Sequence, residues 1–458
     1  MSKRTILQII FITLITMITA IFTLSELNSN LQTSQLDGAL LYSKAAQKLA
    51  ASSANSYTVQ TQKQIITDKN VYTESLIQEV VKSVSDSGEL RLSASNALSI
   101  GDYKITSSCQ YENGTAYLTL DDSRFSSEYT ESTLQKQYAP VILLTPSNYK
   151  NIQSYSVRTG AVVCFTSAVI AEPWAAAEHT AFLQAAGIAR INKKGVLTET
   201  IYCIRYQAQN AVIEKAVIVK PTKHNITWAS IDNSSYTPID SLNAPIALEL
   251  ACGYLLQSDV ISAKSADTIT CDAFGDRVTQ SITLDYTGAK KDLSATLNTN
   301  LLQQNSSRGG EIIETTQSLI FSNGICAVST DNNTVTDESI TQEVMTKYCQ
   351  DVLIGTVLLP QDISDAKYTV TKNQYRFDFS AKEDLADRIS RQACTTLYND
   401  SEFLKNLATA YTSNGAKAYL ILDKATCIPL ASGISYQGTF VIDNFSYALS
   451  YTAEQSYQ

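Results

Sequence analysis

Two Asn-Gly pairs constrain most strongly what this chain can fold into. The pairs, Asn113-Gly114 and Asn323-Gly324, are 210 positions apart, and each stands between two runs in which apolar and polar residues alternate. An Asn-Gly pair between such runs is the strongest short-range indication of a β-hairpin, because both turn residues adopt positive φ. The sequence therefore predicts two antiparallel hairpins at equivalent places in the two halves of the chain.

The order of predicted elements around these hairpins also repeats. Tyr138 and Tyr348, each at the end of the helical pattern that follows a hairpin, are again 210 positions apart. The repeated order is helix, strands, hairpin, helix, strands, helix and final strands, which predicts two copies of one α+β unit at residues 37–240 and 241–458. Each copy is expected to hold an antiparallel sheet. Helical patterns fall at residues 37–53, 127–138, 173–186, 243–256, 339–348, 382–397 and 402–412.

The composition narrows the class of protein. Tyrosine is frequent (25 residues) and tryptophan rare (2 residues), and Thr, Ile and Val are abundant, which favours strands. The net charge of −9 argues against a nucleic acid or an anionic lipid as an electrostatic partner, because either needs a basic face. The nine cysteines form no C-x-x-C pair, and several stand in apolar, strand-like runs, where a cysteine usually behaves as a small buried hydrophobe.

An uncharged, apolar run at residues 5–24 directly follows Lys3 and Arg4, and the first charge after it is acidic, Glu26. About 20 apolar residues rising 1.5 Å each are long enough to span a bilayer core. The basic residues before the run place the N-terminus in the cytoplasm and the bulk of the chain outside the membrane. The segments expected here are a cytoplasmic tail, a transmembrane signal anchor and a polar spacer, at residues 1–4, 5–24 and 25–36.

A cleaved signal peptide is the alternative interpretation of the same run. Its apolar part is usually 7–15 residues and ends in a small-x-small site, whereas here the run is longer and the best site, at Thr23 and Ser25, matches poorly. The first cysteine of the chain is Cys109, so a lipid-modified cysteine next to the run is not supported. The length and the poor site favour an uncleaved anchor.

No arrangement of residues with catalytic chemistry stands out in the sequence. The two histidines, His179 and His224, have no second histidine at metal-ligand spacing, and neither a phosphate loop nor a dinucleotide fingerprint occurs. We therefore expect no catalytic residues, no cofactor and no metal. Paired carboxylates of a hydrolase are brought together only in space and stay open as a remote alternative.

One segment near the C-terminus resembles a known family. Residues 419–430 consist of a strand, the turn Asp423-Lys424-Ala425-Thr426 and a second strand that begins near Pro429. Asp and Thr cap tight turns, and Pro is tolerated at the first position of a strand. The segment resembles the Asp-Lys-x-Thr turn of the LolA/LppX-like lipoprotein-carrier superfamily. That resemblance implies a strongly curved antiparallel sheet, a half-barrel, whose concave apolar face is covered by helices and holds a lipid or another hydrophobic molecule.

Alternation along the last strands suggests which residues face such a cavity: Tyr419, Ile421, Phe440 and Ile442. The alternative is that these side chains pack under the helices and leave no cavity. The function expected is a membrane-tethered, extracytoplasmic, non-catalytic protein that binds a hydrophobic ligand or lipid. A structural or regulatory envelope protein that contacts a protein partner is the main alternative, and an envelope hydrolase the remote one.

Overall fold

The computed structural model describes sixteen segments of the chain. They are residues 38–50, 54–84, 88–131, 151–167, 181–208, 210–222, 231–258, 260–273, 276–289, 293–305, 310–330, 333–345, 358–382, 385, 411–442 and 445–457. The predicted anchor at residues 5–24 lies outside them. Within the described part, no helix combines the length and the apolar character needed to cross a bilayer.

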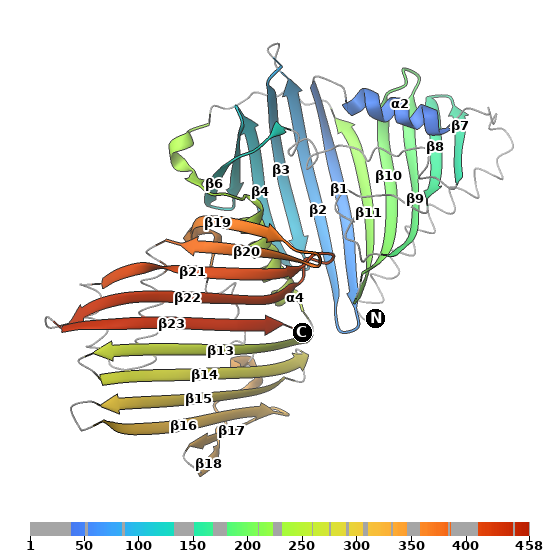
Figure 1. The fold of residues 1–458 in the computed structure, drawn as a ribbon. Helices are drawn as coiled ribbons and strands as arrows, with labels where there is room; N and C mark the ends of the chain where they lie inside the picture. Colours follow the sequence, from blue (N-terminus) through green and yellow to red (C-terminus); the bar gives the residue numbers. More distant parts are fainter. Residues whose placement is uncertain are drawn as a thin grey trace. The chain divides into compact units, whose positions relative to one another are not determined.

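The protein is mostly β, with two large antiparallel sheets and few helices (Figure 1). The described residues form two compact units: one takes in residues up to Asp121 and Ser126–Tyr236, the other Asp122–Phe125 and the chain from Thr237 on. The sequence predicted the boundary between the two copies at residues 240 and 241.

The first sheet has twelve strands in the order β12-β6-β5-β4-β3-β2-β1-β11-β10-β9-β8-β7. Most neighbours in this order are also neighbours in the sequence, and two pairs, β1–β11 and β6–β12, join distant segments, so the sheet is built mainly from hairpins. Its strands are β1 (Ala54–Thr67), β2 (Val71–Val84), β3 (Leu90–Ile100), β4 (Tyr103–Glu112), β5 (Thr115–Leu120), β6 (Ser123–Glu128), β7 (Asn151–Val157), β8 (Gly160–Ser167), β9 (Ala181–Asn192), β10 (Leu197–Ala208), β11 (Ala211–Thr222) and β12 (Thr237–Pro238).

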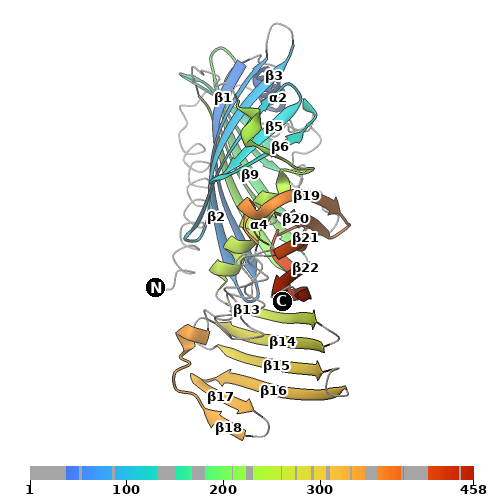
Figure 2. The same cartoon turned by 90° about the vertical axis from the view of Figure 1, so that its left-hand side faces the viewer.

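The second sheet has eleven strands in the order β18-β17-β16-β15-β14-β13-β23-β22-β21-β20-β19. Figure 2 shows β13 to β18 following one another in a single layer. The first and last long strands pair at its centre, β13 with β23, as β1 pairs with β11 in the first sheet. The strands are β13 (Val260–Ala273), β14 (Asp276–Ala289), β15 (Ser294–Asn305), β16 (Glu311–Ser322), β17 (Ile325–Thr330), β18 (Asn333–Thr336), β19 (Ile363–Val370), β20 (Gln374–Ala381), β21 (Tyr411–Asp423), β22 (Pro429–Ile442) and β23 (Phe445–Tyr457).

One α-helix precedes the long strands of each sheet, as the sequence predicted. Helix α2 (Gly38–Ala50) packs on β7 to β10, and helix α4 (Asn243–Gln257) contacts β19 and β22. Two short 3-10 helices lie at Asn233–Ser235 and Pro360–Asp362. Helix α2 buries one face, with Tyr42, Ala45, Ala46 and Leu49, against its sheet. Helix α4 is buried on most of its surface, since ten of its fifteen residues are buried.

Both predicted hairpin turns are confirmed. Asn113-Gly114 joins β4 to β5 and Asn323-Gly324 joins β16 to β17, and all four residues have φ between 52° and 82°. Two consecutive residues with positive φ match the right-handed twist of the strands that they connect.

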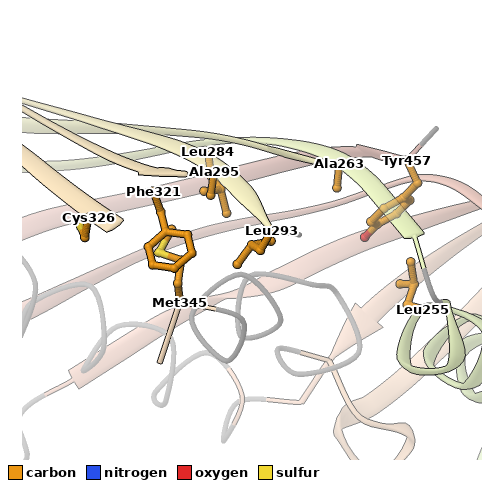
Figure 3. Close-up of a cluster of buried hydrophobic side chains, with 9 residues drawn as sticks. All are labelled: Leu255, Ala263, Leu284, Leu293, Ala295, Phe321, Cys326, Met345 and Tyr457. Atoms are coloured by element: carbon orange, nitrogen blue, oxygen red, sulfur yellow. The ribbon is translucent and has the colours of Figure 1, made fainter. Parts of the chain in front are cut away.

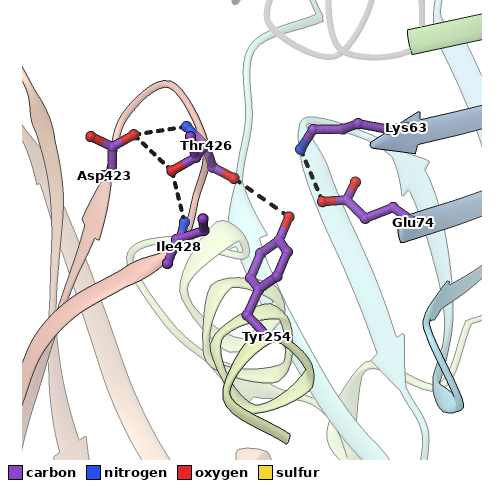
Figure 4. Close-up of polar contacts among 6 residues, drawn as sticks. All are labelled: Lys63, Glu74, Tyr254, Asp423, Thr426 and Ile428. Carbon is purple, nitrogen blue, oxygen red and sulfur yellow. Dashed lines mark hydrogen bonds and ion pairs between the residues drawn. The ribbon is translucent and has the colours of Figure 1, made fainter. Parts of the chain in front are cut away.

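The Asp-Lys-x-Thr turn is confirmed as well (Figure 4). A carboxylate oxygen of Asp423 accepts hydrogen bonds from the backbone N–H groups of Ala425 and Thr426 and from the Thr426 hydroxyl, at 2.8–3.0 Å. Strand β22 begins at Pro429. The Tyr254 hydroxyl of α4 donates to the Thr426 carbonyl oxygen at 3.4 Å, so the turn is joined to the helix of its own unit.

Of the predicted α+β class, the structure shows two antiparallel sheets with few helices, and the described part of the chain is mostly β. The predicted helical stretches at residues 127–138, 382–397 and 402–412 lie mostly outside that part. The Ala-rich stretch at residues 173–186 was expected to be a helix that ends at Gly187, but residues 181–192 form β9. A Cβ atom at Gly187 would lie 2.3 Å from Phe165 Cζ of the neighbouring strand. The small residue is needed there for sheet packing, and this tertiary contact prevails over the helix propensity of alanine.

The second unit is held by a core cluster between its sheet and α4 (Figure 3). Phe321 and Ala295 in the sheet are at most 1% exposed, and Leu255 of α4 belongs to the same cluster. Leu297, Leu319 and Val328 pack against the cluster while only partly buried. Leu255 is the residue that α4 contributes to this cluster, and its burial helps to hold the end of the helix on the sheet.

Candidate functional site

The first sheet has two faces of different character. We call the face on which α2 packs the inner face: the ring of Tyr42 in α2 lies 5.7 Å from the ring of Phe165 in β8. Residues that pair directly across antiparallel strands share a face, so the inner face can be followed from strand to strand. From β8 to β1, successive cross-strand partners on this face are Phe165, Gly187, Tyr202, Val217 and Thr61.

The opposite, outer face carries ion pairs. Glu199 in β10 lies 2.9 Å from Arg190 and 3.2 Å from Lys220, one on each neighbouring strand. Arg205 and Glu214 form a further pair at 3.2 Å. Because these basic side chains are about half exposed, each pair adds little to stability, but together they mark the outer face as the solvated one.

The middle of the inner face holds a group of side chains that are only half-buried, which we call the inner patch. These side chains come from neighbouring strands β11, β1, β2, β3 and β4. The inner patch comprises Val59, Thr61, Lys63, Glu74, Leu76, Gln78, Asn96, Leu98, Ser107 and Lys215.

Buried apolar side chains surround the inner patch on the same face. Toward the β1–β2 turn, Ile65 and Ile213 are fully buried. Toward the other end of the strands, Val80 is fully buried and Tyr57 is 2% exposed. Val59, Leu76 and Leu98 are the apolar members of the inner patch, so the apolar area that a bound molecule can cover lies at these three side chains.

Two sets of polar contacts cross the inner patch. Gln78 donates to Asn96 at 2.8 Å, and Asn96 donates to the Ser107 hydroxyl at 3.2 Å, which links β2, β3 and β4. Lys63 of β1 and Glu74 of β2 form an ion pair at 2.9 Å, with side chains 16% and 14% exposed (Figure 4). The polar groups of this apolar face are therefore arranged in rows across the strands.

The residues that the sequence suggested for a cavity lie elsewhere, in the second sheet. In β21 the buried residues include Ala418, Leu420 and Leu422. Tyr419 and Ile421, which alternate with them, therefore lie on the opposite face and are half-buried. Phe440 and Ile442 belong to β22, and their side chains are outside the described ones. Lining of a cavity by these four residues stays a prediction.

Tyr419 has a clear packing role on its face. Its ring covers Gly433 on the neighbouring strand, where a Cβ atom would lie 2.4 Å from Tyr419 Cε1. The Arg376 guanidinium lies 4.7 Å from the centre of the ring and forms an ion pair with Asp378 at 2.9 Å. Burial raises the pKa of the Tyr419 hydroxyl; Glu454 raises it further and Arg376 lowers it. These contacts explain the position of the Tyr419 ring without a ligand.

Polar side chains on the helix-covered face of the second sheet are hydrogen-bonded to one another. The Ser432 hydroxyl, fully buried, lies 2.9 Å from Gln455 Oε1 and 2.7 Å from the Tyr457 hydroxyl, which donates to Gln455 at 3.0 Å. A satisfied network of this kind fixes strand register. It leaves the inner patch of the first sheet as the stronger candidate site.

No group of three or more His, Cys, Asp or Glu side chains could hold a metal ion within the segments that the structure describes. His179 and His224 lie outside these segments. Burial raises the pKa of the Cys203 thiol to about 11, so this thiol is a poor nucleophile near neutral pH.

The sequence interpretation missed the inner patch, although one local indication was available. Lys63 and Glu74 are charged residues at positions of β1 and β2 that face inward. Charged side chains are seldom buried without a partner, so these two positions differ from the expected pattern. Which position is inward, however, depends on the pairing of β1 with β11, far apart in the sequence.

No protein-family model and no curated protein matches the chain. Among solved structures it is similar to LprF from Mycobacterium bovis, with 10% identity and a TM-score of 0.25 over 43% of this chain and 98% of that one. OccK3 (OpdO) from Pseudomonas aeruginosa matches at 6% identity and a TM-score of 0.12, over 91% and 99% of the two chains. A putative AttH from Nitrosomonas europaea matches at 8% identity and 0.12, over 88% and 92%. At these TM-scores the site has to be interpreted from the geometry of this chain itself.

Proposed function

We propose that this chain is a membrane-tethered, extracytoplasmic and non-catalytic protein that binds a hydrophobic molecule on the inner patch of its first sheet. In this proposal, residues 5–24 are the tether and the chain beyond the spacer is the binding part. The curvature expected of a LolA/LppX-like half-barrel belongs to the proposal too, because it would make the inner face concave.

The observation that carries the proposal is the contrast in burial within one face. Leu76 and Leu98 pair directly across β2 and β3 and are half-buried, whereas Val80 and Ile100, on the same two strands and the same face, are fully buried. Covering apolar area that is still in contact with water contributes roughly 25 cal/mol per Å². An apolar ligand is the simplest molecule that gains from this area.

Photolabelling of the full chain in isolated membranes tests the proposal. A long-chain fatty acid with a diazirine in its tail is added, irradiated and mapped by mass spectrometry. We expect labelled peptides from β1 to β4, and competition by excess unlabelled fatty acid. Leu76→Trp should reduce labelling several-fold, because the larger ring covers the centre of the patch.

The matched control is Ile77→Trp. Ile77 is the next residue of the same strand, lies on the outer face and is 47% exposed. This variant should be labelled as the unchanged protein is. Labelling spread evenly over both faces, or equal in the two variants, would refute binding at the inner patch.

One observation favours the second candidate function, contact with an envelope protein. Three apolar side chains near the edge of the second sheet are well exposed: Ile312 (60%), Ile325 (61%) and Val335 (62%). Exposed apolar side chains near an edge strand are typical of protein contacts. Labelling that is absent from the inner patch would leave this candidate as the better one.

A further inference from the structure

Strand β16 of the second sheet is paired along only part of one side. It pairs with β15 over residues 311–321, whereas β17 pairs only with residues 317–322. Figure 2 shows β17 beside only part of β16. No strand in the described part of the chain pairs with residues 311–316 on the β17 side, and we call these six residues the open edge.

The backbone of the open edge is directed so that it can pair with a further strand. β16 and β17 are joined by the two-residue turn Asn323-Gly324, and in such a hairpin the residues that flank the turn face each other with their backbone N–H and C=O groups. This direction alternates along a strand. Steps of two from the residue before the turn lead to Thr316, Glu314 and Ile312, each of which therefore offers one donor and one acceptor on the open side.

Apolar side chains at the open edge are exposed on both faces of the sheet. Ile313 lies on the same face as the buried Phe321 and is 46% exposed, while Ile312 lies on the opposite face and is 60% exposed. An unpaired strand edge is a template for another strand, and proteins usually protect it. A strand added here would cover apolar area on both faces at once.

The charge around the open edge indicates the chemistry of the partner. The described residues between positions 293 and 345 include acidic residues but no lysine or arginine. The acidic ones are Glu311, Glu314, Asp337, Glu338 and Glu343. Glu314 is exposed, and its carboxylate accepts a hydrogen bond from Asn300 of β15 at 2.7 Å. A second copy of the chain would bring two acidic edges together, whereas a basic segment would complement this one.

We propose that the open edge binds an extended, basic segment of a partner protein, which adds to the sheet as an antiparallel strand. In this mode of binding, main-chain hydrogen bonds provide affinity and alternate side chains provide specificity. Apolar residues of the segment lie opposite Ile312 and Ile313, and a lysine or arginine lies opposite Glu314. The inference rests on the second candidate function, contact with an envelope protein, and is independent of the ligand site in the first sheet.

A photoactivatable peptide tests the inference on the full chain in detergent micelles. The peptide Thr-Thr-Lys-Val-Val-Thr, antiparallel to the open edge, places its lysine opposite Glu314, and a diazirine analogue of leucine replaces its second valine. We expect labels within residues 311–316, mapped by mass spectrometry. N-methylation of the peptide residues opposite Ile312, Glu314 and Thr316 removes the N–H groups that face β16 and should lower labelling by about tenfold or more.

Two pairs of variants examine the backbone and the charge. Ile312→Pro removes an N–H that faces the open side, where proline is tolerated in an edge strand, and should lower labelling as N-methylation does. Its control, Ile312→Val, retains the N–H and should be labelled as the unchanged protein is. Glu314→Gln retains an acceptor for Asn300 and should lower labelling about threefold. Its control, Asp285→Asn, removes an exposed charge from β14, two strands away, and should have no effect.

Each part of the inference has an outcome that contradicts it. Labelling that is absent, that maps outside residues 311–316 or that persists after N-methylation would overturn strand addition. Equal labelling by a peptide with glutamate in place of lysine would overturn the basic partner. Dimers that sedimentation velocity detects and that Ile312→Pro abolishes would show a second copy at the edge instead.

The diazirine fatty acid serves as an independent reference. It should label the inner patch of the first sheet equally in all four variants, which shows that they are folded. Failure of the fatty acid to label the unchanged protein would contradict the hydrophobic ligand site and would leave the result at the open edge unaffected.

Discussion

At the scale of single residues, the turns of this protein are determined by nearby residues. Which face of a sheet a strand residue occupies is not. Asp423 and Thr426 form the capped turn that their spacing predicts, and Asn113 and Asn323 adopt the positive φ expected of hairpin turns. Tyr419, by contrast, lies on the face opposite the buried Leu420. A turn is specified by side chains that bond to their own backbone, whereas the direction of a strand residue is specified by what covers the sheet.

The packing of Tyr419 on Gly433 makes a prediction at this scale. Gly433→Ala introduces a Cβ atom 2.4 Å from Tyr419 Cε1 and 3.0 Å from the Ala453 carbonyl oxygen. We expect the free energy of unfolding of the second unit to fall by about 1–3 kcal/mol, as is usual for overpacking. Urea unfolding followed by circular dichroism measures the effect.

The matched experiment is the same substitution in a Tyr419→Ala background. There the ring is gone, and the cost of Gly433→Ala should be smaller by about 1 kcal/mol, a coupling that a double-mutant cycle isolates. Additive effects of the two substitutions would show that the ring does not rest on Gly433.

At the scale of elements, the helices and strands differ in how well local sequence determines them. Helix α2 was predicted because its apolar residues recur with helical spacing, and α4 coincides with the helical stretch expected at residues 243–256. Strand β9 was not, because its alanines favour a helix when taken alone. Pairing with β8 and β10 on both sides, and the contact of Phe165 with Gly187, decide in favour of the strand.

The strands around β9 also predict a dependence on alkaline pH. Burial raises the pKa of the Cys203 thiol in β10 from 9.0 to about 11, and that of Cys164 in β8 to about 11 against a smaller lowering effect of Arg190. Between these values the folded protein holds thiol protons that the unfolded chain has released. Stability is therefore unaffected by these groups below pH 9 and falls between pH 9 and 11, by up to about 1.4 kcal/mol per pH unit and thiol.

Urea midpoints measured from pH 7.5 to 10.5 check this expectation. Cys203→Ala should make the decline above pH 9 shallower, because one of the titrating groups is removed. Cys427→Ala is the control, since Cys427 is half-buried and belongs to the second unit. An unchanged slope in Cys203→Ala would contradict a buried, protonated thiol.

At the scale of the whole molecule, the chain presents one topological theme twice. In each sheet an α-helix precedes the first long strand, that strand pairs with the last long strand, and an Asn-Gly hairpin follows three strands later. The inner patch belongs to the first sheet, while the described helix-covered face of the second holds the Ser432–Gln455–Tyr457 network. The two sheets thus have similar topology but differ in the side chains on their helix-covered faces.

The proposed tether at residues 5–24 predicts how the mature protein behaves in cells. We expect it to stay in the membrane pellet after carbonate extraction, with residues 5–24 still present in its intact mass. Leu14→Arg should lower membrane insertion, because an arginine at the centre of a span costs about 2.5 kcal/mol or more. A mature protein whose mass lacks residues 5–24 would instead support the cleaved signal peptide.

Local sequence was sufficient for the features that depend on near neighbours: the two hairpin turns, the Asp-Lys-x-Thr turn and the two helices. Each of these is specified within a few residues, by positive φ, capping or helical periodicity. Only tertiary structure decided that β9 is a strand, that Tyr419 lies opposite the buried face, and that Lys63, Glu74 and Lys215 form one row. These features depend on strand pairing over as many as 152 positions, as between Lys63 and Lys215. A pattern of period two leaves both faces equivalent until such pairing and a covering helix distinguish them.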